Sequence, residues 1–311
     1  MGRGSASGEP QTSEAARAIA RMRPSGRRRL TVDPETREQL ARMTEPRRED
    51  AVRAGAESDY GLDLEFRKRS EPLFRFLWES YWRCDVTGME NVPASGPCIL
   101  VGNHSGGLPL DATMIAYGLS SERGPGRIVR PLYDKFVEGM GPGKGLYRKL
   151  GGVPAKYAVA DEMLERGEVP VIFPEGVGGV AKLYDERYRV GGFSSSAARL
   201  SCRHRVPIIL FAVIGAEETY PMIGRSAQLG KLLGAPYVPI TPFFPMLGLA
   251  GMIPLPTKWS IAFGKRIYLY RESRFRGENC TDFDEMSDRL RRTVQILVGR
   301  HLGRRSSIFL G

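Results

Sequence analysis

Three runs of consecutive apolar residues constrain the possible fold of this chain most strongly, because each run is short and lies between segments that suit helices. The runs occupy residues 98–103 (CILVGN), 169–173 (VPVIF) and 207–214 (PIILFAVI). A run without polar alternation is typical of a strand buried on both faces, as in a parallel sheet covered by helices. Helical segments are predicted between and after the runs, at 112–119, 158–166 and 194–201. The pattern predicts an α/β fold with a mostly parallel central sheet flanked by helices.

The two ends of the chain differ in character. Residues 1–55 are Arg-rich and without sustained periodicity, which predicts a disordered tail, and we assign 56–311 to one folded domain. An amphipathic helix is expected at 60–83, with Pro72 as a possible start. A C-terminal helix is expected at 282–301, and further strands at 128–132, 259–263 and 266–270.

The charge balance points to an anionic partner. Lys and Arg number 46 against 35 Asp and Glu, a net charge of +11, and residues 84–311 carry most of the excess, with 29 basic and 21 acidic side chains. Nucleic acid, a membrane surface and phosphorylated substrates all fit such a surplus. No nucleic-acid-binding motif is present, so no nucleic-acid partner is expected. The four Cys have no metal-ligand or disulfide spacing, and no secretory signal is seen in residues 1–50, so we expect reducing cytoplasm and no metal.

One long stretch carries no charge at all, the 26 residues between Lys231 and Lys258. It is long enough to span a bilayer, but six prolines within it exclude a continuous membrane helix. Two interpretations stay open for this apolar loop. It packs onto the core of its own domain, or it forms a surface that enters lipid or lines an acyl-chain groove.

Of the three histidines, His104 has the most informative position. It directly follows the first buried strand, at the strand end where α/β sheets bind ligands. The Gly and Pro residues after it let the chain turn back, so Asp111 could reach the imidazole and make its other nitrogen a better base. The alternative is a structural histidine beside a helix-capping aspartate. His204 is expected to be solvated, and His301 to end the last helix.

Four blocks in this order resemble the glycerolipid acyltransferases, the lysophospholipid acyltransferases of phosphatidic-acid synthesis. They are Asn103-His104…Asp111, Leu150–Lys156 (LGGVPAK), Phe173-Pro174-Glu175-Gly176, and the strand from Val206 that continues to Glu218. The chain departs from the family in two ways. Six residues separate His104 from Asp111 where four are usual, although some bacterial sequences look similar, and Lys156 is the nearest match to the usual second-block arginine.

The resemblance implies transfer of an acyl group from acyl-CoA or acyl carrier protein to a hydroxyl, without a covalent enzyme intermediate and without a cofactor. His104 would act as the base, with Asp111 orienting it. Glu175 and Gly176 would shape the acceptor pocket, and Pro207 would lie on the acyl-binding side. Lys156, Lys182 and Arg187 would bind substrate, the last two by meeting a phosphate, unless they belong to a solvated basic loop.

The expected protein is therefore a peripheral enzyme at the cytoplasmic face of an anionic membrane. Its partners would be an acyl thioester donor and a lipid acceptor, first of all an acyl-glycerol-phosphate. Two alternatives remain: an acyltransferase for a neutral glyceride or another alcohol, and a lipid-surface binding protein without turnover. Acyl-chain length and oligomeric state are left open.

Overall fold

The computed structural model describes residues 60–106, 108–121, 124–134, 137, 143–232, 235–272 and 282–310. The predicted tail, residues 1–55, lies outside the described residues. The first described helix, α4 (Leu64–Phe76), begins at Asp63, whose Oδ1 accepts the N–H of Phe66 at 2.8 Å. This is a side-chain cap of the usual kind. The helix ends in a π-helical turn, η1 (Leu77–Tyr81), so Pro72 lies inside the predicted helix and does not start it.

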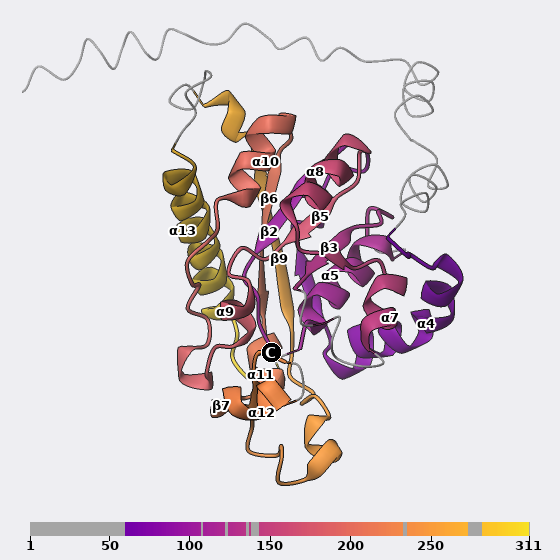
Figure 1. Cartoon of the computed structure of the whole chain (residues 1–311), viewed down its shortest axis with the longest axis vertical. Coiled ribbons are helices and arrows are strands. Elements are labelled where there is room, and N and C mark those ends of the chain that lie inside the picture. The colour runs from indigo at the N-terminus through magenta and orange to yellow at the C-terminus, as the bar shows by residue number, and fades with distance from the viewer. Residues whose placement is uncertain are drawn as a thin grey trace, which may run out of the picture. The chain divides into compact units, whose positions relative to one another are not determined.

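A seven-stranded sheet forms the centre of the domain, in the order β1-β9-β6-β2-β5-β3-β4. Its strands are β1 (Asp85–Thr87), β2 (Ile99–Gly102), β3 (Arg130–Tyr133), β4 (Val153–Pro154), β5 (Pro170–Ile172), β6 (Ile208–Ile214) and β9 (Ser260–Ile267). Neighbouring strands run parallel except for β6 and β9, which are antiparallel. The predicted fold class, a mostly parallel central sheet flanked by helices, is confirmed (Figure 1).

Helices cover both faces of the sheet. One face packs against α5 (Leu110–Ser120) and the end of α4, and its core includes the stacked rings of Trp82 and Trp259, 4.5 Å between centroids. The other face packs against α8 (Tyr157–Glu165), α10 (Ser196–His204) and α13 (Phe283–Leu302). Because alternate residues of each strand enter opposite cores, the buried strands are apolar throughout.

The remaining elements are short. They are η2 (Met89–Asn91), α7 (Gly143–Lys149), α9 (Val177–Val180), η3 (Tyr184–Glu186), α11 (Ala216–Thr219), α12 (Ala227–Leu232), η4 (Gly248–Met252) and η5 (Leu269–Arg271), with the pair β7 (Gly224–Ser226) and β8 (Val238–Ile240). In the described part of the chain, none of the helices has the length and apolarity needed to cross a membrane.

Several predicted elements need correction. The two late strands expected at 259–263 and 266–270 are one strand, β9, and residues from Leu269 onward form a 3-10 turn. A single strand forms because β9 pairs with β6 on both sides of Gly264, with a shift of register between the two paired stretches. The strand expected at 128–132 begins two residues later and ends one residue later, as β3. His204 is not solvated, since its Nε2 lies 2.7 Å from Asp161 Oδ1 and its side chain is largely buried.

Candidate active site

Two loops meet where β2 and β5 end. The strands are parallel neighbours, with Val101 opposite Ile172, so the residues that follow them reach the same edge of the sheet. His104 comes two residues after β2, and Glu175 three residues after β5. Asn103 fixes the first loop by exchanging two hydrogen bonds of 2.9 Å with the backbone of Val213 in β6. The sheet therefore determines where His104 lies.

His104 and Asp111 are in direct contact. His104 Nδ1 lies 2.8 Å from Asp111 Oδ2, and that oxygen also accepts the N–H of Ser105 at 2.9 Å. Asp111 Oδ1 accepts the N–H of Ala112 at 2.7 Å at the start of α5, and the side chain is fully buried. Asp111 thus orients the imidazole from the first turn of α5, where a negative charge is favourable. A carboxylate facing Nδ1 holds the proton on that nitrogen and leaves Nε2 as the base.

The six residues between them accommodate this contact by turning tightly. Leu108 N–H donates to Gly106 O at 2.6 Å, and Leu110 N–H to Leu108 O at 2.7 Å. Gly106 has φ +97°, and a Cβ there would lie 2.8 Å from the carbonyl oxygen of Ala216. Only glycine fits this close approach. The longer spacing therefore does not prevent the His–Asp pair.

Glu175 supports the His104 loop from the opposite side. Its Oε1 accepts the backbone N–H of His104 at 3.0 Å, and its Oε2 accepts the N–H of Gly191 at 2.7 Å. The Glu175 side chain is only 2% exposed, and its oxygens are occupied by the protein itself. The next residue, Gly176, has φ +57° and ψ −145°, a conformation that favours glycine.

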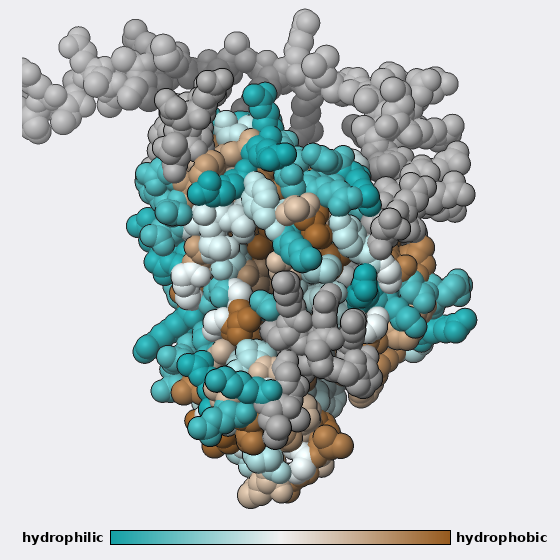
Figure 2. All heavy atoms as spheres, viewed as in Figure 1, coloured by the Kyte–Doolittle hydropathy of each residue, from teal (hydrophilic) through white to brown (hydrophobic). Residues whose placement is uncertain are grey.

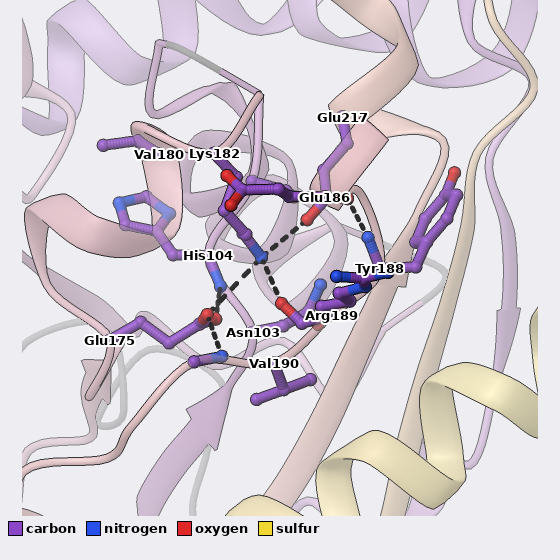
Figure 3. A network of polar contacts seen from close by, with 12 residues as sticks. Asn103, His104, Glu175, Val180, Lys182, Glu186, Tyr188, Arg189, Val190 and Glu217 are labelled. Carbon is purple, nitrogen blue, oxygen red and sulfur yellow. Dashed lines mark hydrogen bonds and ion pairs between the residues drawn. The ribbon is translucent and has the colours of Figure 1, made fainter. Parts of the chain in front are cut away.

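Lys182 joins Glu175 to a second buried carboxylate. Its ammonium lies 3.4 Å from Glu175 Oε2 and 2.7 Å from Glu217 Oε1, and it donates to Arg189 O at 3.2 Å (Figure 3). Burial alone would lower the pKa of Lys182, but the two carboxylates outweigh it and raise that pKa above its usual value. The Lys182 charge is thus already paired within the protein, and the phosphate-binding role expected for Lys182 stays a prediction.

A cavity of about 340 Å³ adjoins His104, Glu175 and Gly176. Its walls come from both faces of the sheet: Ala112 and Ala116 of α5 on one side, and Ala160 and Leu200 on the other. Most of its lining is apolar, which suits a hydrocarbon chain. His104 stacks on Phe173 at 4.1 Å between ring centroids, and only 13% of its side chain is exposed. The imidazole is therefore held at the wall of an apolar cavity.

The predicted basic residues separate into two groups. Lys156 lines the cavity, as do Leu150, Gly152 and Ala155 of the same block. Arg187 does not; its guanidinium lies over the ring of Tyr184 at 4.3 Å, and with Lys182 it borders a small separate hollow.

Pro207 is not brought to the site. It precedes Ile208, which pairs with Ile99 at the start of β2, whereas His104 follows the end of that strand. The expectation that Pro207 lies on the acyl-binding side is corrected, because strand direction places it at the opposite edge of the sheet.

Two site residues were not singled out from the sequence. Glu217 belongs to the fourth block, but its partner Lys182 lies 35 positions earlier in the chain, so no local spacing connects them. Arg67 of α4 lines the cavity beside Leu150, and no local pattern distinguishes it within the amphipathic helix predicted at 60–83. Among the described residues, no group of three His, Cys, Asp or Glu is arranged to hold a metal ion.

Comparison with known proteins finds a matching family model and related sequences. The family model for acyltransferases matches residues 83–213, which include His104, Asp111 and Glu175. An uncharacterised protein of Mycobacterium tuberculosis H37Rv is 36% identical over 259 residues, 81% of this chain and 71% of the relative. An uncharacterised protein of Mycobacterium leprae is 35% identical over 81% of this chain and 70% of the relative.

A solved structure is also similar, the 1-acyl-sn-glycerophosphate acyltransferase PlsC of Thermotoga maritima. It is 17% identical, with a TM-score of 0.49, over 86% of this chain and 88% of that one. On the family model and the mycobacterial relatives, the chain belongs to the acyltransferase family. The predicted resemblance is confirmed at this level, and with it the expectation of an acyltransferase.

Proposed function

We propose that this enzyme transfers a fatty acyl group from acyl-CoA or acyl carrier protein to the hydroxyl of a lysophospholipid, an acyl-glycerol-phosphate, at the cytoplasmic face of a membrane. The observation that carries the proposal is the 2.8 Å contact between His104 Nδ1 and Asp111 Oδ2 at the wall of the apolar cavity. An oriented base beside a hydrocarbon-lined cavity is what acyl transfer to an alcohol requires.

The proposed reaction follows from the position of Nε2. This nitrogen removes the proton of the acceptor hydroxyl while the oxygen attacks the thioester carbonyl, and Asp111 stabilises the imidazolium that forms. Collapse of the tetrahedral intermediate forms the ester and breaks the carbon–sulfur bond. The thiolate leaves and recovers the proton from the imidazolium, so atoms and charge balance without a covalent enzyme intermediate.

Glu175 takes a positioning role in this mechanism. It holds the backbone of His104, Lys182 pairs with Glu175, and Glu217 in turn pairs with Lys182. Because a misplacement of about 1 Å can reduce a rate on the order of a hundredfold, this buried network supports catalysis without touching the substrate.

An acyl-transfer assay with purified protein tests the proposal. The donors are radiolabelled palmitoyl-CoA and palmitoyl-acyl carrier protein, and the acceptors are lysophosphatidate, monoacylglycerol and a simple long-chain alcohol. Labelled phosphatidate is the expected product, and His104→Ala should form none above background while keeping its melting temperature. Equal product from wild type and His104→Ala would overturn the mechanism.

One observation favours a second acceptor class, a neutral glyceride or other alcohol. Lys182 is neutralised by two carboxylates and Arg187 borders a separate hollow, so neither predicted phosphate contact reaches the cavity. Lys156 and Arg67 are the cations among the described residues that line it. In the same assay, faster acylation of monoacylglycerol than of lysophosphatidate, unchanged in Lys156→Met, would select the neutral acceptor.

A further inference from the structure

The uncharged stretch noted in the sequence is part of a longer excursion from the sheet. Residues 215–259 leave the end of β6 and return at the start of β9, where Ile214 pairs with Ser260. This is the edge of the sheet where His104 lies, and the loop after His104 packs directly on the first residues of the excursion, Gly106 against Ala216. A partner that binds residues 215–259 is therefore held close to the sheet edge that carries His104.

The tip of the excursion exposes large apolar side chains. Met246 is 78% exposed, Leu249 83% and Ile253 64%, and Leu247 is exposed as well. We name these four residues the apolar tip. Figure 2 shows hydrophobic residues gathered at the lower end of the view, where Figure 1 draws the excursion. Of the two interpretations left open for this loop, packing onto the core does not hold for these four residues. They are also not among the residues that line the cavity.

Hydrogen bonds fix the backbone around the apolar tip. Thr241 N–H donates to Phe244 O, and Leu247 N–H to Phe243 O, both at 2.8 Å. The hydroxyls of Tyr81 and Tyr220 donate to the carbonyls of Pro254 and Met252 at 2.6 and 2.8 Å. These bonds connect the returning half of the excursion to η1 and to the chain after α11. The tip thus presents its side chains on a backbone with its own hydrogen bonds.

The exposed charges of the excursion itself are positive. The excursion contains two acidic residues, Glu217 and Glu218, and both are buried and paired with Lys182 and Arg305. Its exposed charges include Arg225 and Lys231. The C-terminal segment beside its base, joined by Lys258 N–H to Ile308 O at 2.8 Å, adds exposed Arg304 and an 86% exposed Leu310. Lys258 itself is paired with Asp85.

We infer that the apolar tip inserts into an anionic phospholipid bilayer and that Arg225, Lys231 and Arg304 bind lipid headgroups around it. Exposed apolar side chains on a segment whose exposed charges are cationic match the two attractions of a bilayer surface, hydrocarbon burial and negative headgroup charge. The inference deepens the proposed function by naming the surface that brings the catalytic edge to the membrane, and it rests on residues outside the cavity.

The experiment compares wild type, Leu249→Glu, the double variant Met246→Glu/Leu249→Glu, and Ile296→Glu. Ile296 is a matched control because it is 62% exposed on α13. Binding to vesicles of phosphatidylglycerol and phosphatidylcholine is measured by co-sedimentation. The single tip variant should bind at least about tenfold more weakly, and Ile296→Glu should bind as wild type does. Circular dichroism melting confirms that each variant folds.

Two further readouts separate this inference from the proposed function. With a water-soluble short-chain acceptor, the tip variants should keep the wild-type rate, and with acceptor embedded in vesicles they should lose it. Lys231→Gln/Arg304→Gln should weaken binding to anionic vesicles and leave binding to pure phosphatidylcholine unchanged. Vesicle binding without any acyl transfer would overturn the proposed function alone.

Unchanged vesicle binding in the double tip variant would overturn the inference. So would a concentration-dependent dimer of the wild type that the tip variants abolish, accompanied by no vesicle binding, because the tip would then bind a second copy of the chain.

Discussion

Asp111 Oδ2 lies 2.8 Å from His104 Nδ1 and 2.9 Å from the backbone nitrogen of Ser105, so one buried oxygen holds both the ring and the loop that carries it. The ring is held on its other side by Phe173. Since both supports come from the sheet edge and the start of α5, the orientation of the base is determined before any substrate binds. Preorganisation of this kind removes a reorganisation cost from the reaction.

Removing the base and removing its partner should have different effects. His104→Ala should lower kcat by about a hundred- to ten-thousand-fold, the usual contribution of general-base catalysis. Asp111→Asn should lower kcat by a smaller factor with little change in KM, because the ring keeps its place but loses the charge that stabilises the imidazolium. Steady-state assays with labelled acyl donor measure both. An Asp111→Asn enzyme as fast as wild type would exclude the orienting role.

Lys182 is predicted to matter for stability more than for substrate binding. Lys182→Met leaves Glu175 and Glu217 buried without their shared cation, and loss of one partner in such a group costs on the order of 3 kcal/mol of unfolding free energy. Urea denaturation measures this change. Adding Glu217→Gln should recover part of the loss, and the exposed Lys156→Met should change stability by no more than about 0.5 kcal/mol. If Lys182→Met were as stable as wild type, the ion pairs of Lys182 with Glu175 and Glu217 would not stabilise the fold.

Arg67 is predicted to limit acyl-chain length once a chain occupies the cavity. Its Nη2 donates to Ser120 Oγ at 2.8 Å, at the far end of the 11-residue helix α5 from Asp111, roughly 14 Å along the helix axis. Contact between a half-buried guanidinium and a terminal methyl group is unfavourable, because it removes water from the charged group. Burial, with the charge of Arg130, lowers the pKa of Arg67 to about 10. It therefore stays charged at neutral pH.

Arg67→Met should then shift donor preference toward longer chains, with the ratio of kcat/KM for C18 over C14 acyl-CoA rising severalfold. The exposed Arg69 on the same helix provides the matched control, Arg69→Met. If the variant keeps both its melting temperature and the wild-type preference for acyl-chain length, the end of the acyl chain does not lie beside Arg67.

Alkaline pH should weaken the fold through its buried thiols. Burial raises the pKa of Cys98 from its ordinary value of 9.0 to about 11. Because the unfolded chain loses this proton first, the contribution to stability is complete below pH 9 and declines as the pH rises toward 11. Urea denaturation at pH 8 and pH 10.5 measures the loss. Cys98→Ala should be less stable than wild type at pH 8, since the substitution leaves a cavity. Its free energy of unfolding should, however, fall less between pH 8 and pH 10.5. An equal fall in both proteins would show that other groups cause the alkaline effect.

The sequence alone was sufficient for the elements that depend on local pattern. The buried strands after residues 98, 169 and 207 and the C-terminal helix follow from apolar periodicity, which acts over a few residues. The pairing of His104 with Asp111 was also foreseeable, because the two residues are seven apart with a glycine-rich turn between them.

Tertiary structure decided what depends on distant partners. Lys182 meets Glu217 only because the chain after β5 and the chain after β6 reach one sheet edge, and Pro207 lies at the other edge because of strand direction. The exposure of Met246 and Leu249 likewise depends on where the excursion folds, since an apolar run can pack inward or face outward. Local composition determines which segments are apolar or charged. Long-range packing determines which of those charges are neutralised and which apolar side chains remain in solvent.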